Sequence, residues 1–175
     1  MAKALVVIDV QKGMFAMPDL PPHDGEQVVE RIAGLIARAR AAATPVFFVQ
    51  HDGGPRDPYF RADGEGFPFH DRLTPEPGDS VTVKRASSAF TGTDFDQVLR
   101  RAGIDHLVIT GMQSEYCVDS AVRGAADRGF QVTLVADAHS TFDSKVAAAE
   151  QIIAIQNDTM SDSFATVVPA SEVAF

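Results

Sequence analysis

The sequence has few features that would form a disulfide, direct secretion or anchor the chain in a membrane. Cys117 is the only cysteine among 175 residues, so no disulfide can form within the chain, which is typical of a reducing compartment. No apolar run reaches the length of a transmembrane helix. The run from Ala4 to Val10 is too short for a signal peptide and contains Asp9. We therefore expect a soluble, cytoplasmic protein.

Positive charge is also scarce. Lys and Arg number 15 against 24 Asp and Glu, which gives a formal net charge of -9. A chain of this charge repels the phosphate backbone of nucleic acids and the surface of anionic membranes. We expect neither nucleic acid nor a membrane among its partners.

The rest of the composition is that of an ordinary globular domain. Hydrophobic residues make up 45% of the chain and charged residues 22%. A length of 175 residues fits one compact domain and allows a sizeable core. We expect residues 1–175 to form a single domain.

Short apolar runs alternate along the chain with helical patterns. We expect strands at residues 5–8, 46–49, 81–83, 107–109, 132–135 and 165–168, and helices at residues 28–39, 95–99, 116–128 and 146–155. Asp24 is expected to cap the first helix, and Gly103 and Gly129 to end the second and third. Strands that are apolar throughout and separated by helices predict an α/β protein with a parallel sheet covered on both faces.

One long segment, about residues 52–79, interrupts this alternation. It is rich in Gly, Pro and charged residues, and a loop of this length within a compact domain is usually functional or disordered. Its four aromatic residues favour a packed, lid-like insertion: Tyr59, Phe60, Phe67 and Phe69.

Three polar residues follow predicted strands. Asp9 comes directly after the first strand, Lys84 after the third, and Cys117 shortly after the fourth. Ligands of a doubly wound sheet bind beyond the carboxyl ends of its strands, so the three are expected at one edge. Each has a plain structural explanation as well. Asp9 would cap a turn, Lys84 would be a solvated strand end, and Cys117 would be a small buried side chain.

A carboxylate, an ammonium group and a thiol together fit nucleophilic catalysis. A helix N-terminus and a nearby cation favour the thiolate of Cys117. Asp9 is then expected to take the thiol proton and pass it to a leaving group, while Lys84 keeps Asp9 charged and in place. Backbone N–H groups of the turn before the helix are expected to hold a developing oxyanion.

Four segments of the chain, in order, resemble the isochorismatase-like hydrolases. They are VIDVQ (7–11), KRASSAFTGT (84–93), VITGMQSEYCVDSA (108–121) and GFQVTLVADA (129–138). The resemblance implies a three-layer α/β sandwich with a mostly parallel, six-stranded, doubly wound sheet. It also implies a catalytic triad of Asp9, Lys84 and Cys117. Family members include nicotinamidases, N-carbamoylsarcosine amidases, streptothricin hydrolase and isochorismatases, and are commonly homo-oligomers, so a dimer or larger assembly is expected.

The resemblance also implies an oxyanion hole. A cis peptide is expected between Met112 and Gln113, with the N–H groups of Gln113 and Cys117 turned toward one oxygen. The residues expected to line the substrate pocket are Gln11, Phe15, His51, Phe90 and Tyr116, although core packing explains the aromatic ones equally well.

Two departures narrow the expected activity. The stretch QHDGG (50–54) lacks the Asp-x-His spacing with which nicotinamidases hold a metal, and His51 is better explained as a pocket residue. We therefore expect no metal or other cofactor. Isochorismatases that cleave a vinyl ether do not need the cysteine, so Cys117 favours hydrolysis of an amide or related C–N bond. The sequence of residues 111–119 is similar to that of the streptothricin-hydrolase-like branch of the family.

Three hypotheses remain open from the sequence. The first is this cysteine-dependent hydrolase of a small molecule, with vinyl-ether hydrolysis as its variant within the family. The second is phosphoryl transfer at Asp9 with Thr110 and Lys84, although no second acidic residue for Mg²⁺ follows Asp9. The third is a non-enzymatic binding or thiol-sensing module, although a lone cysteine has no resolving partner.

Overall fold

The computed structural model describes residues 2–17 and 19–175, and a six-stranded sheet forms its centre. The strands are β1 (Lys3–Ile8), β2 (Val46–His51), β3 (Ser80–Lys84), β4 (His106–Met112), β5 (Gln131–Ser140) and β6 (Thr166–Val168). They lie in the order β3-β2-β1-β4-β5-β6, and every neighbouring pair is parallel. The predicted six-stranded, doubly wound sheet is confirmed, and it is parallel throughout.

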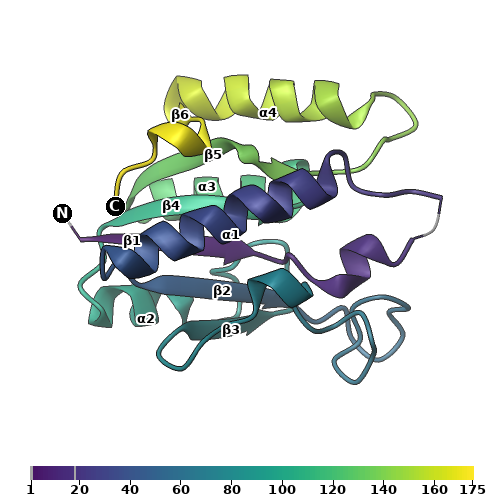
Figure 1. Ribbon diagram of the computed structural model, residues 1–175, viewed down its shortest axis with the longest axis horizontal. Helices are drawn as coiled ribbons and strands as arrows, with labels where there is room; N and C mark the ends of the chain where they lie inside the picture. The colour runs from purple at the N-terminus through teal and green to yellow at the C-terminus, as the bar shows by residue number, and fades with distance from the viewer. Residues whose placement is uncertain (1, 18) are drawn as a thin grey trace.

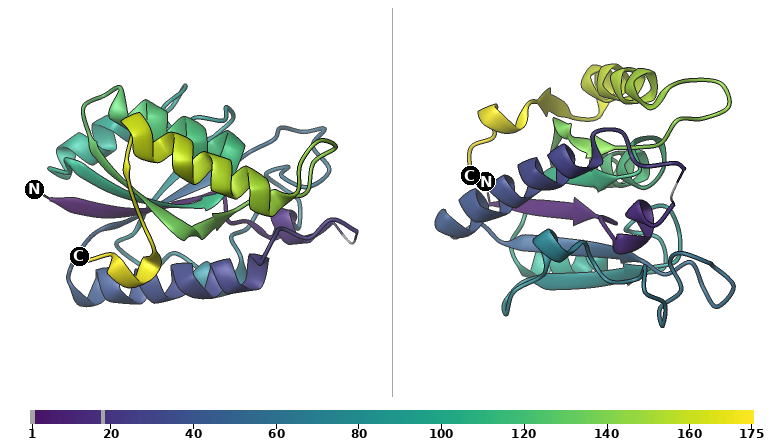
Figure 2. Two further views of the ribbon diagram at one scale, coloured as in Figure 1. Left: turned by 90° about the horizontal axis from the view of Figure 1, so that it is seen from above. Right: turned by 45° about the vertical axis from the view of Figure 1, so that its right-hand side comes forward.

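Helices cover both faces of this sheet. The α-helices are α1 (Gly25–Ala41), α2 (Phe95–Arg101), α3 (Asp119–Ala126) and α4 (Ala149–Ser163). Shorter helical turns are η1 (Lys12–Phe15), η2 (Asp71–Leu73), η3 (Ser114–Val118) and η4 (Ala170–Glu172). Helix α1 lies on one face, and α3 and α4 lie on the other (Figures 1 and 2). The result is a three-layer sandwich.

Strand β1 shows why the central strands are mostly apolar. Val6 and Ile8 pack into the core on the α3 side, while Leu5 and Val7 pack into the core on the α1 side. Because a parallel sheet of this kind is covered on both faces, every residue of β1 after Lys3 is buried. The same burial gives β1 the rigidity to place Asp9, the residue that follows it.

The chain reverses its winding direction between β1 and β4. From β1 it proceeds to β2 and β3 on one side, and from β4 to β5 and β6 on the other. Ligands bind at such a switch point, beyond the carboxyl ends of the strands. Gly111 pairs with Ile8 there at a φ of 125°, and a Cβ atom would collide with the Ile8 backbone. Only glycine lets the two strand ends come this close.

Two of the predicted helices differ from the observed ones. The helix expected over residues 116–128 is divided into one π-helical turn, Ser114–Val118, followed by α3. The helix expected from Val146 begins at Ala149 and continues to Ser163, so its predicted start and end are wrong. Val146 lies in the preceding loop, 94% exposed. Within the described residues, no helix is both long and apolar enough to cross a membrane.

The segment of residues 52–79 packs against the chain that follows β1. The N–H groups of Lys12 and Gly13 donate to the carbonyls of Pro68 and Gly66, at 2.9 and 2.8 Å. The N–H of His70 donates to the carbonyl of Val10 at 2.9 Å. The segment is therefore held beside the switch point, where a lid would lie, and its closing over a substrate stays a prediction.

Candidate active site

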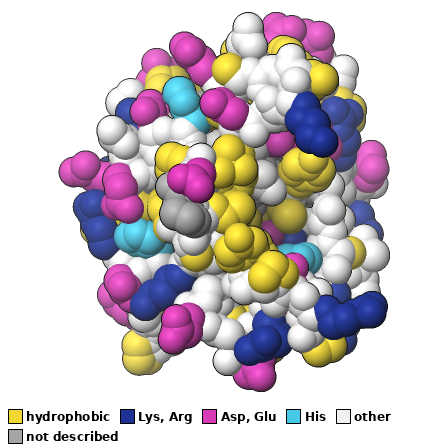
Figure 3. Space-filling view, turned by 90° about the vertical axis from the view of Figure 1, so that its right-hand side faces the viewer, with side chains coloured by type: hydrophobic (Ala, Val, Ile, Leu, Met, Phe, Trp, Pro, Cys, Tyr) yellow, Lys and Arg dark blue, Asp and Glu magenta, His cyan; other side chains and the backbone are white. Residues whose placement is uncertain are grey.

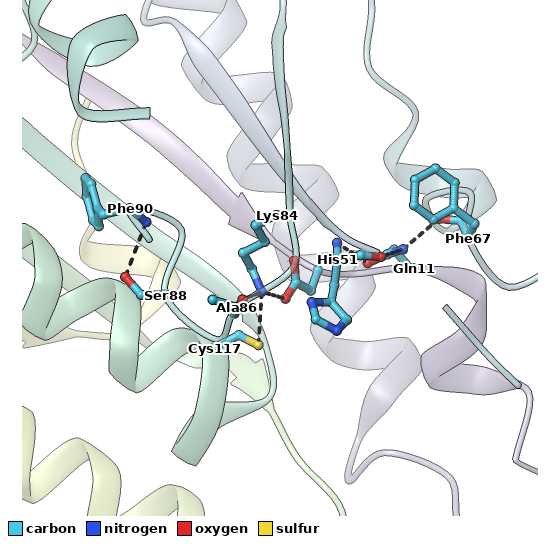
Figure 4. A network of polar contacts seen from close by, with 9 residues as sticks. Gln11, His51, Phe67, Lys84, Ala86, Ser88, Phe90 and Cys117 are labelled. Atoms are coloured by element: carbon cyan, nitrogen blue, oxygen red, sulfur yellow. Dashed lines mark hydrogen bonds and ion pairs between the residues drawn. The ribbon is translucent and has the colours of Figure 1, made fainter. Parts of the chain in front are cut away.

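Asp9, Lys84 and Cys117 meet at the carboxyl edge of the sheet. Asp9 follows β1, Lys84 is the last residue of β3, and Cys117 lies in the turn η3 that follows β4. The Lys84 Nζ atom lies 2.6 Å from Asp9 Oδ2 and 3.2 Å from Cys117 Sγ, and Figure 4 shows the lysine reaching toward the thiol. The three residues that the sequence predicts at one edge are in contact.

The Lys84 ammonium group is surrounded by three polar partners. It donates to Cys117 Sγ and, at 3.0 Å, to the carbonyl of Ala86, and it forms an ion pair with Asp9. The residue is only 1% exposed, and a buried charge of this kind is tolerated when it is paired and its donors are satisfied. Lys84 is therefore a fixed positive charge between the carboxylate and the thiol.

The Asp9 backbone has an uncommon conformation that aims its side chain at Lys84. Its φ is 49°, in the left-handed region that residues other than glycine seldom adopt. Backbone hydrogen bonds hold it there, because its N–H donates to Val49 and its carbonyl accepts from Gln11, both at 2.9 Å. Such a conformation persists only where its surroundings fix it.

The Asp9 carboxyl group is fully buried, which favours its protonated form. Burial raises its pKa, and the attraction of Lys84 opposes that rise. The Oδ1 atom is shielded from solvent and has no hydrogen-bond partner among the described residues. A carboxylate with a raised pKa and a free oxygen is suited to accept a proton.

The Cys117 thiol is protonated at neutral pH in this arrangement. Burial and the nearby Asp9 raise its pKa to about 12, and Lys84 lowers it by less. The expectation that the surroundings favour the thiolate is wrong for the resting site, because burial outweighs the effect of the single cation. Attack by Cys117 therefore needs a base in contact with it, and Asp9 is the carboxylate in reach.

The turn that carries Cys117 is wound around one carbonyl group. The Gln113 carbonyl accepts the N–H groups of Tyr116 at 3.2 Å and Val118 at 3.1 Å, which closes the π-helical turn. The Met112–Gln113 peptide is cis, as expected. The donation of the Gln113 and Cys117 N–H groups to a substrate oxygen stays a prediction.

Gln11 and His51 are joined by their backbone and side-chain amides. The Gln11 side chain accepts the N–H of His51 at 2.8 Å and donates to the His51 carbonyl at 3.0 Å. It also donates to the carbonyl of Phe67 at 2.7 Å. Since Gln11 is fully buried, it holds His51 and the 52–79 segment in place, and its direct contact with substrate stays a prediction.

The His51 ring lies near the Lys84 ammonium group, as Figure 4 shows. It packs edge-on against Phe60, with ring centroids 5.9 Å apart. Burial, then the nearby Lys84, lowers its pKa, so the ring is neutral at pH 7. Its Nδ1 atom is buried without a hydrogen-bond partner among the described residues, and is available to a ligand.

The three aromatic residues expected in the pocket lie in different surroundings. Phe15 is half-buried, with its ring centroid 4.8 Å from that of His70. Phe90 is 7% exposed and packs between other phenylalanine rings of the core on the α3 side. Tyr116 is 55% exposed. Figure 3 shows the side of the molecule that lies on the right in Figure 1. Hydrophobic side chains gather at its centre, with charged ones around them. The substrate contacts of the three aromatic residues stay predictions.

Asp52 is engaged elsewhere and does not join His51 in a ligand cluster. Its carboxylate accepts from Arg85 Nη2 at 2.8 Å and from the Gly54 N–H at 2.9 Å, and these bonds lower its pKa. Among residues 2–17 and 19–175, no group of three or more His, Cys, Asp or Glu side chains is arranged to hold a metal ion. The absence of a metal cofactor stays a prediction.

Sequence reasoning missed a buried polar chain behind the turn η3. Ser114 Oγ lies 2.8 Å from His139 Nδ1, and His139 Nε2 lies 2.9 Å from Asn157 Oδ1. No spacing in the sequence indicates this chain, because its members come from η3, β5 and α4.

Comparison with known proteins agrees with this geometry. The family model of the isochorismatase domain matches residues 3–172. The chain belongs to the isochorismatase family. An isochorismatase family protein of Bacillus subtilis is 32% identical over 157 residues, which cover 87% of each chain. A streptothricin hydrolase of Streptomyces noursei is 34% identical over 145 residues, 83% of this chain and 52% of the relative.

The isochorismatase family fold extends over the whole chain. The crystal structure of an N-carbamoylsarcosine amidase from Thermoplasma acidophilum superimposes with a TM-score of 0.82 and 26% identity, covering 100% of both chains. The resemblance that the four sequence segments indicate is thereby confirmed. The chain is a hydrolase of the isochorismatase family, and amidohydrolases are among its relatives.

Proposed function

We propose that this isochorismatase family hydrolase cleaves an amide or related C–N bond of a small molecule through a thioester on Cys117. The observation that carries the proposal is the contact of one buried lysine with both a carboxylate and the only thiol, at 2.6 and 3.2 Å. The relatives that hydrolyse streptothricin and N-carbamoylsarcosine support C–N chemistry in a fold of this kind.

The first half of the reaction forms the thioester. Asp9 takes the proton of the Cys117 thiol, and the sulfur attacks the substrate carbonyl carbon. The carbonyl oxygen becomes an oxyanion, which the N–H groups of Gln113 and Cys117 stabilise. When the tetrahedral intermediate collapses, Asp9 returns the proton to the leaving nitrogen, and the amine or ammonia departs.

The second half releases the acid. Asp9 takes a proton from water, and the resulting hydroxide attacks the thioester carbonyl. The S–C bond breaks, the proton on Asp9 goes back to sulfur, and the carboxylic acid leaves. Lys84 stays charged throughout and compensates the negative charge as it moves between Asp9 and Cys117.

His51 supports the proposal as a contact for the substrate. Its neutral ring has a buried Nδ1 without a partner, beside the Lys84 ammonium group. A hydrogen-bonding group of the substrate would satisfy that atom, and an unsatisfied buried polar atom otherwise costs about 1–3 kcal/mol. The contacts of Gln11 hold the His51 backbone in position before a substrate arrives.

A panel of small amides, carbamoyl compounds and cyclic amides tests the proposal. The native chain is expected to release ammonia or amine from at least one of them, and Cys117→Ala is expected to release none above background. Cleavage of a vinyl ether by both forms, with no C–N hydrolysis by either, would assign the site to the other reaction of the family.

A further inference from the structure

The turn that carries Cys117 is tied to an outer helix by three side chains. Ser114 Oγ and His139 Nδ1 lie 2.8 Å apart, and His139 Nε2 and Asn157 Oδ1 lie 2.9 Å apart. Ser114 and His139 are each 1% exposed. Ser114 is the first residue of η3, His139 lies near the end of β5, and Asn157 lies in the middle of α4.

The hydrogen bonds among Ser114, His139 and Asn157 all run in one direction. The Asn157 amide Nδ2 donates to the carbonyl of Ala136 at 3.1 Å, so its Oδ1 faces His139 as an acceptor. His139 Nε2 therefore carries the ring proton, and Nδ1 is left to accept the Ser114 hydroxyl proton. Burial lowers the pKa of His139, which keeps the ring in this neutral form.

Helix α4 needs such a polar contact, because little of it is buried. Only Ala149 and Met160 of its 15 residues are buried, and Ile155 is 62% exposed. In Figures 1 and 2, α4 lies at the outside of the molecule, over β5 and near α3. Asn157 thus connects a sparsely packed helix to the innermost turn of the site.

Ser114 lies where a small displacement would matter to the proposed reaction. It separates Gln113 from the rest of the turn, and the Gln113 carbonyl holds the N–H groups of Tyr116 and Val118. The backbone on either side of Ser114 carries both proposed oxyanion donors. The turn is therefore fixed from within by Gln113 and from outside by the Ser114 hydroxyl.

We infer that Ser114, His139 and Asn157 form a positioning chain that holds the Gln113 and Cys117 N–H groups in register for the oxyanion. The inference rests on the proposed thioester mechanism and adds residues to it that do not touch the substrate. These three hydrogen-bonded side chains act on a step in which an oxyanion forms. They have no effect on the nucleophilicity of Cys117, which Asp9 and Lys84 set.

Two reactions of the same thiol separate these effects. Acylation of Cys117 by p-nitrophenyl acetate passes through an oxyanion, whereas alkylation by iodoacetamide does not. Loss of a whole oxyanion donor costs about 10²–10³ in rate, so loss of its positioning by Ser114→Ala is expected to slow acylation by about tenfold or more. The rate of alkylation at the same pH is expected to stay within about twofold of native.

The remote end of the chain gives the second variant. Asn157→Ala changes a residue in α4 and is expected to slow acylation several-fold with alkylation unchanged. Ser114→Thr keeps the hydroxyl and is expected to restore acylation to near the native rate. The matched control is Ser161→Ala, which removes an exposed hydroxyl bonded within α4.

Each remaining result decides against the inference in a different way. Native acylation in folded Ser114→Ala and Asn157→Ala would overturn the positioning role while leaving the thioester mechanism intact. An equal fall of acylation and alkylation would assign the chain to general stability of the turn. If p-nitrophenyl acetate leaves no acyl adduct on Cys117 of the native chain, the thioester mechanism fails, and the positioning role fails with it.

Discussion

The Lys84 ammonium nitrogen lies 2.6 Å from the Asp9 carboxylate, and both side chains are 0% exposed. A buried pair of this kind is stable only as a pair, because each charge alone would lose its hydration without compensation. The geometry therefore couples the stability of the fold to the residues proposed to perform the chemistry.

The first prediction concerns that pair. Lys84→Met leaves the Asp9 charge buried and unpaired, and is expected to destabilise the protein by about 3–5 kcal/mol. The double variant Asp9→Asn/Lys84→Met removes both charges and is expected to lose less than the sum of the two single variants. Urea unfolding of all four proteins measures the coupling, and purely additive losses would contradict a tight buried pair.

The second prediction follows from the raised pKa of Cys117. The thiol is neutral when protonated, and its pKa is about 12 in the folded chain against a reference of 9.0. The stability due to the partly buried thiol is therefore complete below pH 9 and is lost as the pH rises toward 12. The native chain is expected to lose up to about 1.4 kcal/mol per pH unit in that range, relative to Cys117→Ala.

The check is the difference in free energy of unfolding between native protein and Cys117→Ala, measured from pH 8 to 11. Groups away from the site titrate equally in both proteins, so their contributions cancel, and the difference reports on Cys117 and the two charged groups beside it. A difference that stays constant over this range would show that the thiol has an ordinary pKa.

The third prediction follows from the same raised pKa and concerns the rate at which Cys117 is alkylated. Only the thiolate reacts with iodoacetamide, so alkylation of Cys117 is expected to be slow at pH 7 and to rise about tenfold per pH unit to beyond pH 10. The measurement is the second-order rate constant against pH. A plateau reached near pH 7 would mean that the resting site holds a thiolate, contrary to the burial and charge described above.

The fourth prediction separates His51 from the fold around it. His51→Phe keeps an aromatic ring against Phe60 but removes Nδ1, and is expected to raise KM about tenfold, the equivalent of one hydrogen bond. The melting temperature is expected to change little. The same change at His106, at the opposite end of β4, serves as the control and should leave KM as it is. An unaltered KM in His51→Phe would exclude its proposed contact with substrate.

Much of the site could be predicted from the sequence because strand ends are easy to locate. Apolar runs followed by Asp9 and Lys84, and one shortly before Cys117, indicate parallel strands, and the topology then brings those residues to one edge. The central position of β1 makes the prediction robust, since both of its faces are buried.

The remainder depended on contacts between distant residues. The start of α4 is set by Asp143 and Ser144, whose side chains accept the N–H groups of Ala149 and of Val146, and not by the apolar Val146 itself. Gln11 makes three bonds to His51 and Phe67 that no pattern in the sequence indicates, and its contact with substrate stays a prediction. Neither the depth of burial of Cys117 nor the chain behind Ser114 leaves a pattern along the sequence.

The most direct test of the central claim is the mass of the protein during turnover. The native chain is mixed with the best substrate from the amide panel and quenched in acid within the first turnovers. We expect a mass increase equal to the acyl group, located by peptide mapping on Cys117, and none in Cys117→Ala. Amine release by Cys117→Ala at the native rate, without any acyl adduct on the native chain, would contradict a cysteine thioester mechanism.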